Sequence, residues 1–579
     1  MSHGLSMRPL CIWIRSGHFL GFSALAIFLF TLESNHSTDG VSSPYLDRTA
    51  AYGISFRHQR GASAQKYLVE SAGSGCALFD YDADGWLDLL MINGGATPDS
   101  PPVQFHGHVL YRNLGNGKFQ DVTAKSGITA KNAYGMGVAI GDYDNDGYPD
   151  VYITNFGPNI LYHNNGNGTF TDVTERAGVG GSGWNTSAAF FDYDNDGYLD
   201  LYVTRYLDFS YDRKLVCTEK NIRSYCHPRH FSGLANRLYR NVGNGRFLDV
   251  SERSGIANSE GKGLGVVAAD FDGDGWLDIY VANDTTRNIL WKNNRNGTFS
   301  DVTLSSGTGY NSEGEAEAGM GTDAGDYNRD GLLDIVVTNY DLETNALYRN
   351  DGASVFSDAR WSSGIAKEDH LLLGFGTGFL DFDNDGDEDL FIANGHVLDN
   401  IELIRDNIHY AQPLQLFENQ NGKFIEHPGF KHFASISPKV GRGACFGDID
   451  NDGDVDIVIS NSGQEPTLLV NQLGQGKSWI LLRLTGTQSN RDGVGAKITV
   501  VTESDTQFKQ VMGGRSYLSA SDLRVHFGLG DVSRVKEITV KWPSGAEDVL
   551  KDIKANQVLS LKEGTSLRAA SPHHSTQFQ

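Results

Sequence analysis

The chain has 579 residues, enough for several domains, and its formal net charge is −24 at pH 7. An acidic surface is unfavourable for nucleic-acid phosphates and for anionic lipid, so we expect neither as a partner. Glycine is abundant, with 69 residues, which indicates many turns.

The first 34 residues resemble an export signal. Arg8 and Arg15 precede an uncharged apolar run at residues 19–32, and polar sequence follows. The run is short for a bilayer span of about 20 residues, so a signal peptide is favoured, and an uncleaved N-terminal anchor is the alternative. We therefore expect a secreted or extracytoplasmic chain, with residues 1–34 as the signal or anchor and residues 35–44 as a linker.

An acidic nine-residue pattern occurs seven times. It has Asp at positions 1, 5 and 9, Asp or Asn at position 3 and Gly at position 6. A glycine-rich apolar stretch precedes each copy, an alternating β-branched run follows it, and a second hairpin, often with an Asn-Gly turn, comes next. Four strands per unit, repeated seven times, predict an all-β fold with a seven-bladed β-propeller at residues 45–475.

The seventh unit predicts how the ring closes. It ends after the apolar run at residues 467–472 and lacks a fourth strand. Residues 45–54, which precede the first repeat, have the features of such a fourth strand. We predict that residues 45–54 pair with the last blade, because this removes two open sheet edges at once.

The spacing of the acids predicts calcium loops. Calcium takes six to eight oxygen ligands, and Asp at alternate positions before a sharp Gly turn directs oxygens to one centre. A helix–loop–helix EF-hand would need Glu at position 12, but this position is apolar in every copy, as at Ile153 and Val203, and lies in an expected strand. Asp at position 9 closes each loop instead, so we expect the ion to lie between two strands of one blade.

About seven calcium ions are therefore expected, and polar turns without metal are the alternative. The fifth loop has Asn328 at position 3, and we expect the weakest site there because it loses one charge. The expected ligands are Asp80, Asp82, Asp84 and Asp88; Asp142, Asp144, Asp146 and Asp150; Asp192, Asp194, Asp196 and Asp200; Asp270, Asp272, Asp274 and Asp278; Asp326, Asn328, Asp330 and Asp334; Asp381, Asp383, Asp385 and Asp389; and Asp448, Asp450, Asp452 and Asp456.

Three insertions interrupt the repeats, at residues 206–234, 311–325 and 394–413, and the third has helical apolar spacing. The first contains Cys217 and Cys226, for which export favours a disulfide. A metal site that adds His227 and His230 is the alternative, although this spacing matches no common zinc pattern.

Residues 476–565 read as a separate all-β unit. We expect strands at residues 479–486, 496–502, 523–530, 537–542 and 557–564, separated by Gly, Asp and Ser-Gly turns. Residues 566–579 are expected to be a disordered tail.

The loops and their Asn-Gly hairpins resemble FG-GAP (VCBS-type) repeats, as in integrin α-subunit propellers. Residues 476–565 are similar to the ASPIC/UnbV domain through the sequences at 490–500, 513–530 and 540–545. A propeller followed by this domain resembles the cartilage acidic protein family. The resemblance implies secretion, calcium binding and an adhesion or matrix role, but no single biochemical activity.

Two classes of function stay open. The first is a secreted, calcium-binding module for extracellular protein or polysaccharide, which we expect to be a monomer. The second is an extracellular enzyme that acts on polysaccharide, since fold alone does not decide function. Binding is favoured because the sequence contains no nucleophile elbow, no phosphate loop and no paired catalytic acids distinct from the expected calcium ligands.

Overall fold

A computed structural model describes residues 43–102, 105–129, 134–213, 215–257, 261–367, 370–431, 436–474 and 476–565. The expected signal or anchor at residues 1–34, most of the linker at 35–44 and the tail at 566–579 lie outside these residues. The described residues belong to one compact unit that begins at Ser42. Within them, no helix is long and apolar enough to cross a membrane.

The described chain contains seven four-stranded antiparallel sheets that each include one acidic loop. The first four sheets consist of β2 (Cys76–Phe79), β3 (Asp88–Met91), β4 (Val109–Asn113) and β5 (Phe119–Asp121); β6 (Tyr134–Gly141), β7 (Asp150–Phe156), β8 (Ile160–Asn164) and β9 (Phe170–Asp172); β10 (Asn185–Phe191), β11 (Asp200–Arg205), β14 (Arg237–Asn241) and β15 (Phe247–Asp249); and β16 (Gly263–Ala269), β17 (Asp278–Asn283), β18 (Ile289–Asn293) and β19 (Phe299–Asp301).

The next two sheets consist of β20 (Thr322–Gly325), β21 (Asp334–Val337), β22 (Ala346–Asn350) and β23 (Phe356–Asp358); and β24 (Gly374–Leu380), β25 (Asp389–Asn394), β26 (Gln415–Asn419) and β27 (Phe424–Glu426). The last contains β28 (Gly441–Gly447), β29 (Asp456–Asn461), β30 (Thr467–Asn471) and, from the other end of the chain, β1 (Tyr45–Asp47).

The helices are all short. They are α1 (Val69–Ala72), α2 (Thr123–Ser126), α3 (Thr174–Ala177), α4 (Thr303–Ser306), α5 (Arg360–Ser363) and α6 (Pro428–Lys431), with 3-10 turns at Pro228–His230, Ile365–Lys367 and Ile401–Leu403. The helical expectation for residues 394–413 is therefore correct only for the single turn at Ile401–Leu403. Apolar side chains of this insertion, among them Leu398 and Ile408, are buried against the insertion at 206–234 without forming a longer helix.

The seven sheets form a β-propeller, as the repeats predict. The first strand of each sheet contacts the first strand of the next, in the order β2, β6, β10, β16, β20, β24 and β28, and β28 contacts β2 again. The ring is joined at β1, which pairs antiparallel with β30 through Tyr45 and Asn471, Leu46 and Val470, and Asp47 and Leu469. Segments from both ends of the propeller therefore share one blade.

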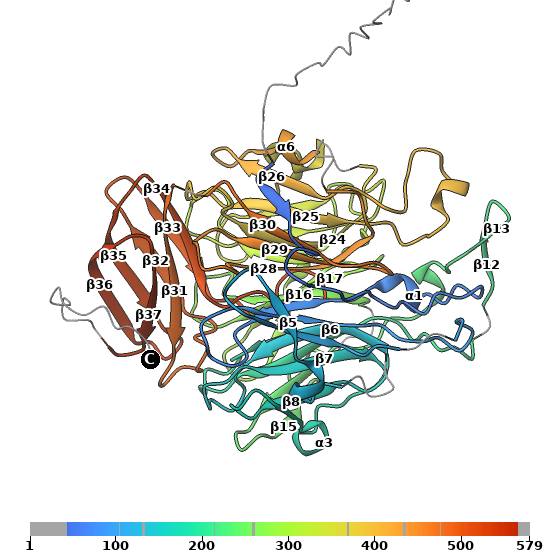
Figure 1. Cartoon of the computed structure of the whole chain (residues 1–579), viewed down its shortest axis with the longest axis horizontal. Coiled ribbons are helices and arrows are strands. Elements are labelled where there is room, and N and C mark those ends of the chain that lie inside the picture. Colours follow the sequence, from blue (N-terminus) through green and yellow to red (C-terminus); the bar gives the residue numbers. More distant parts are fainter. Residues whose placement is uncertain are drawn as a thin grey trace, which may run out of the picture. The chain divides into compact units, whose positions relative to one another are not determined.

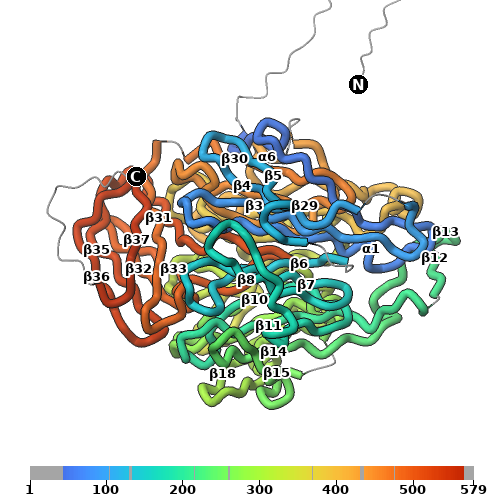
Figure 2. Tube along the Cα trace, turned by 60° about the horizontal axis from the view of Figure 1, so that its bottom comes forward, coloured from blue at the N-terminus to red at the C-terminus, as the bar shows by residue number. Residues whose placement is uncertain are grey.

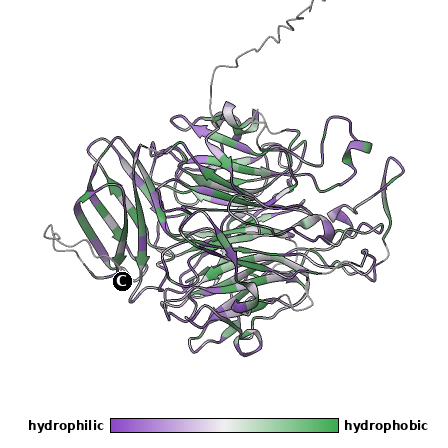
Figure 3. Cartoon of the chain, viewed as in Figure 1, coloured by the Kyte–Doolittle hydropathy of each residue, from purple (hydrophilic) through white to green (hydrophobic). Residues whose placement is uncertain are grey.

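The C-terminal domain is built from two further sheets. One contains β34 (Val525–Gly530), β31 (Ser478–Thr485) and β37 (Gln557–Lys562), and the other β33 (Thr506–Gln510), β32 (Lys497–Val501), β35 (Arg534–Lys541) and β36 (Glu547–Lys554). Apolar residues from both sheets, such as Leu482 and Ile538, are buried in one cluster with residues of the β6 and β10 sheets. The strands carry most of the hydrophobic residues together with hydrophilic ones, and many connecting loops are hydrophilic (Figure 3).

The central channel of the propeller is occupied by a segment of the C-terminal domain. Residues 513–524, between β33 and β34, contact the first strand of every sheet. Backbone or side-chain hydrogen bonds join this segment to Cys76, Val138, Ser187, Ala268, Thr322, Thr377 and Phe446. A segment that bonds to all sides of the ring lies within it, so we call residues 513–524 the channel segment.

The channel segment explains the glycines that precede the acidic loops. A Cβ on Gly75 would lie 1.7 Å from the carbonyl oxygen of Leu518, and a Cβ on Gly443 would lie 2.3 Å from the Ser519 hydroxyl oxygen. Neither position can hold a larger residue without displacing the channel segment. Arg515 adds an ion pair inside the ring, because its Nη2 lies 2.7 Å from the fully buried Asp323 carboxylate.

A recurring asparagine in the third strand of each sheet connects neighbouring blades. Asn293 is buried, and its side-chain amide donates to the carbonyl of Tyr193 in the preceding sheet's loop, at 2.8 Å, and to that of Leu277, at 3.1 Å. The equivalent residues are Asn113, Asn164, Asn241, Asn350, Asn419 and Asn471. Asn113 bonds to Ile449 of the last blade, so the series runs around the whole ring.

We predict that Asn293→Ala destabilises the propeller by about 1–3 kcal/mol, because it removes the donor to two buried carbonyls. Asn294→Ala is a matched control, since Asn294 is the next residue, is exposed and its side chain bonds only to Thr298 and Ser300 of its own hairpin among the described residues. We expect the control to change stability by less than about 0.5 kcal/mol. The midpoints of chemical unfolding of both variants provide the test, and equal midpoints would contradict the bridging role.

Candidate metal sites

Each acidic loop joins the first and second strands of its sheet, and its backbone sets the positions of the carboxylates. In the second loop, the amides of Asp146 and Gly147 donate to the two oxygens of Asp142 at 3.0 and 2.7 Å. Asn145, at position 4, has a φ of 60°, and the position-4 residues of the other loops are also left-handed. Asn tolerates this conformation and Gly adopts it freely, which explains why they occupy five of the seven position-4 sites.

The aspartate at position 9 is fixed from two sides. Asp150 is fully buried, and its oxygens accept from the amide of Asn164 at 2.8 Å and from that of Tyr143 at 3.3 Å. One oxygen each of Asp142, Asp144 and Asp150 lie within 4.8 Å of one another, and the first, third and fourth loops hold similar groups. The loops therefore gather carboxylate oxygens to a common centre, as the spacing predicts.

Several of these buried carboxylate oxygens have no hydrogen-bond partner among the described residues. The Oδ1 atom of the position-3 aspartate is unpartnered in four loops, at Asp82, Asp144, Asp194 and Asp450. Oδ1 of Asp381 and Oδ2 of Asp334 are unpartnered in two others. A buried oxygen without a partner is costly, so its recurrence in six loops fits these residues to a cation that takes oxygen ligands.

Burial also raises the pKa values of several aspartates in the loops. Removal from water raises the pKa of Asp150 to about 7, that of Asp278 to about 8 and that of Asp334 to about 9. Neighbouring carboxylates of the same loop raise these pKa values further. These groups would hold protons near neutral pH unless a positive charge compensated them.

Four loops carry a basic side chain beside the acids, a feature that the sequence analysis missed. Arg112 Nε lies 2.7 Å from Asp82, and Arg240 Nε lies 2.6 Å from Asp194. The same place in the third strand is held by His163, with Nδ1 at 3.3 Å from both Asp144 and Asp150, and by Lys292, which pairs with Asp272. The signal was present in the sequence, because each of these residues directly precedes the recurring asparagine.

The other three loops lack this basic neighbour. Arg349 holds the place in the fifth sheet, but it pairs with Asp351 at 2.7 Å rather than with the loop. Glu418 holds it in the sixth sheet and Val470 in the seventh. The loops therefore differ in built-in positive charge although their acids are nearly the same.

The C-terminal domain is docked on the acidic loops. Arg483 lies 2.8 Å from Asp80, and Lys497 pairs with Asp270. Asp492 accepts from the backbone amide of Asp142 at 2.8 Å. The position-1 aspartates of the first, second and fourth loops therefore serve both their loops and the contact between the two domains.

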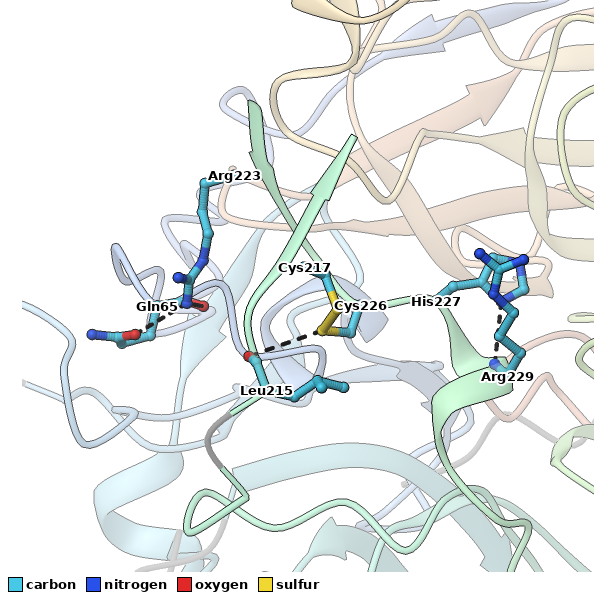
Figure 4. The surroundings of a disulfide bond; sticks show 7 residues. All are labelled: Gln65, Leu215, Cys217, Arg223, Cys226, His227 and Arg229. Carbon is cyan, nitrogen blue, oxygen red and sulfur yellow. Dashed lines mark hydrogen bonds between the residues drawn. A yellow bond between two sulfur atoms is a disulfide. The ribbon is translucent and has the colours of Figure 1, made fainter. Parts of the chain in front are cut away.

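Cys217 and Cys226 form a disulfide (Figure 4). It closes the hairpin of β12 (Cys217–Glu219) and β13 (Ile222–Ser224) in the first insertion. The metal-site alternative is wrong for this structure, because the two sulfurs bond to each other and cannot act as thiolate ligands. Cys76 and Cys445 are buried free thiols.

Family models match both parts of the chain. The FG-GAP-like repeat model matches residues 80–153, 142–203, 230–281, 270–337, 326–392 and 381–459, and the ASPIC and UnbV model matches residues 486–568. Cartilage acidic protein 1 of Homo sapiens is 26% identical over 322 residues, which are 54% of this chain and 46% of the relative. The Xenopus tropicalis protein of that name is 26% identical over 49% of this chain and 42% of the relative, so both matches span less than half of the relative.

Two solved propeller-like structures show weaker likeness. The BP39L lectin from Burkholderia pseudomallei has a TM-score of 0.42 at 9% identity and covers 70% of this chain and 97% of its own. YCF48 bound to D1 peptide has a TM-score of 0.40 at 9% identity and covers 74% and 96%. These likenesses are too distant to inform on a ligand. The repeat matches extend over most of the propeller, and the chain belongs to the FG-GAP-like repeat family, carries a C-terminal ASPIC and UnbV domain and is similar to cartilage acidic protein 1.

Proposed function

We propose that this chain is an exported, calcium-stabilised propeller that binds extracellular protein or polysaccharide. The observation that carries the calcium part is the buried carboxylate oxygen without a partner, which recurs in six of the seven loops. Oxygen-only ligand sets at this spacing are the chemistry that calcium prefers. Positions 1, 3, 5 and 9 of each loop would hold the ion, with Asn328 in place of an aspartate in the fifth loop.

Calcium would supply the positive charge that these loops need. Each ion adds two charges to a group of three or four acids at positions 1, 3, 5 and 9, some of which have pKa values that burial has raised. Its binding would therefore favour the folded blades, since the unfolded chain does not preform the sites. Extracellular calcium is concentrated enough to fill sites with dissociation constants of about 10⁻⁴–10⁻³ M.

Two features support export. The N-terminal sequence has the basic flank and short apolar run of a signal peptide. The Cys217–Cys226 disulfide is typical of oxidising compartments. Both features support an extracellular environment, in which calcium is abundant.

The arrangement of the domains supports a binding role. The C-terminal domain contacts the loop face, and its channel segment fills the ring. The insertions at 206–234 and 394–413 pack together elsewhere on the propeller, with α1 between them in the same apolar cluster. We propose that the surface built by these insertions, rather than the loop face, meets the partner.

Removal of calcium tests the metal sites. We expect a chelator to lower the melting temperature by more than 10 °C, because several sites lose their ions together, and we expect atomic spectroscopy to find close to seven ions per chain. Added calcium should restore the original melting temperature. Magnesium at the same concentration should not, because it requires a smaller and more regular oxygen shell. An unchanged melting temperature in chelator would contradict the proposal.

The basic neighbours predict that the loops differ in calcium affinity. Arg112→Gln should tighten calcium binding in the first loop by about two- to fivefold, the size of a partly exposed ion pair, because Arg112 competes with the metal for Asp82 and Asp84. Glu418→Gln should weaken the sixth site by a similar factor. Arg246→Gln is the control, since Arg246 is exposed in a turn. Calorimetric titration of each variant gives the affinities, and identical curves for all three would contradict the ranking.

A binding screen tests the partner class. Residues 35–579 should bind members of a panel of matrix proteins and polysaccharides saturably in calcium, and chelation should abolish the binding. Release of new reducing ends from a polysaccharide without stable binding would instead identify an enzyme.

A further inference from the structure

A cavity of about 170 Å³ lies at the end of the propeller where the insertions gather. Its lining includes residues from all three insertions and from α1. In Figures 1 and 2, α1 and the β12–β13 hairpin lie at the end away from strands β31–β37 of the C-terminal domain. The cavity is thus separate from the acidic loops, and Tyr517 of the channel segment forms part of its lining.

Aromatic rings form much of the cavity wall, and all belong to elements that are fixed by packing. Trp184 and Tyr206 meet edge to face with ring centres 4.9 Å apart, and Phe375 meets Tyr517 at the same distance. The complete aromatic set is Trp184, Tyr206, Tyr225, Tyr340, Phe375 and Tyr517. The faces of aromatic rings carry partial negative charge, and packing holds these rings in place.

Three carboxylates line the same cavity. Asp284 follows β17 and accepts a hydrogen bond from the Tyr206 hydroxyl, and Glu343 accepts from the backbone amide of Ala318 at 2.8 Å. Glu219 is at the end of β12, in the hairpin that the disulfide closes. Residues distant in the chain therefore bring their acids to one small space.

The described residues leave these acids with little positive charge. Neither Lys nor Arg is among the described residues that line the cavity, and Lys262 is the nearby cation whose charge lowers the pKa of Asp284. Its ammonium, however, bonds to the carbonyl of Pro228 and the hydroxyl of Thr285, both at 3.1 Å. His227 is on the wall, and burial lowers its pKa, which favours the neutral ring.

Burial disfavours the charged form of two of these carboxylates and leaves one N–H donor of the cavity wall without an acceptor. Burial raises the pKa of Asp284 to about 6 and that of Glu343 to about 7. The Trp184 side chain is fully buried, and its Nε1 has no acceptor among the described residues. A ligand that brought positive charge to the carboxylates would relieve the first of these costs.

We infer that this cavity binds a small organic cation, an ammonium group carried on a short apolar or aromatic body. The ammonium would be attracted by the carboxylates and by the ring faces together, and a desolvated cation over aromatic rings gains substantially from this contact. The apolar body would occupy the space beside Leu264 and Met320. Apolar walls with a few convergent polar groups are the usual composition of small-molecule sites. The inference does not depend on calcium binding by the loops.

Phenethylamine and 2-phenylethanol provide the first test, because they have nearly the same shape and differ in charge. Calorimetry on residues 35–579 in excess calcium should show phenethylamine binding with a one-to-one ratio. We expect it to bind at least about tenfold tighter than 2-phenylethanol. Equal affinities, or no binding of the amine, would overturn the inference, as would displacement of the amine by further calcium.

Neutral variants locate the site. Glu343→Gln and Asp284→Asn should each weaken phenethylamine by about fivefold or more and leave 2-phenylethanol unchanged. Glu503→Gln is the matched control, because Glu503 is an exposed acid of the C-terminal domain. Melting temperatures show whether each variant is folded. The Asp284 variant must be compared with the Glu343 variant, because Asp284 also accepts a hydrogen bond from Tyr206. If both variants remain folded and bind the amine like the control, the cavity is not the site.

Discussion

Close packing of carboxylates is the constraint on which this structure depends. Each acidic loop holds three or four acids at positions 1, 3, 5 and 9, and burial raises the pKa values of several of them toward or above neutrality. Backbone amides, such as those of Asp146 and Gly147, satisfy the position-1 oxygens in six loops, while position 3 keeps an unpartnered oxygen in four loops. The protein therefore offsets the negative charge of the loops only in part, and a divalent cation would supply the remaining positive charge.

The loops also connect the fold as a whole. They present the carbonyls to which the recurring asparagines bond, so each blade is attached to the one before it through the loop. The C-terminal domain contacts the same loops through Arg483 and Lys497, and its channel segment bonds to the first strand of every sheet. Blade stability, domain contact and loop charge are therefore properties of one connected region. A substitution in one of these loops should therefore also affect the C-terminal domain.

Patterns with a fixed spacing were predictable from the sequence. The apolar residues at position 12 placed the loops between strands, and the position-9 aspartates proved to be buried beside the other acids. The basic residues before the asparagines were not anticipated, because they come from a distant strand and only the fold brings Arg112 to Asp82. Strands β33 and β36 were missed because Thr506–Gln510 and Glu547–Lys554 are rich in polar residues and lack clear alternation. The path of residues 513–524 depends on long-range packing, which local sequence does not encode.

The measurement that tests the account most directly is an anomalous difference map of crystals grown in millimolar calcium. The account predicts peaks among the position-1, 3, 5 and 9 oxygens, strongest in the sixth and seventh loops, where the third strand supplies no basic neighbour. In the first loop, Arg112 should have moved away from Asp82 wherever a peak is present. Loops that keep their Arg and Lys pairs and show no peak at this calcium concentration would contradict it.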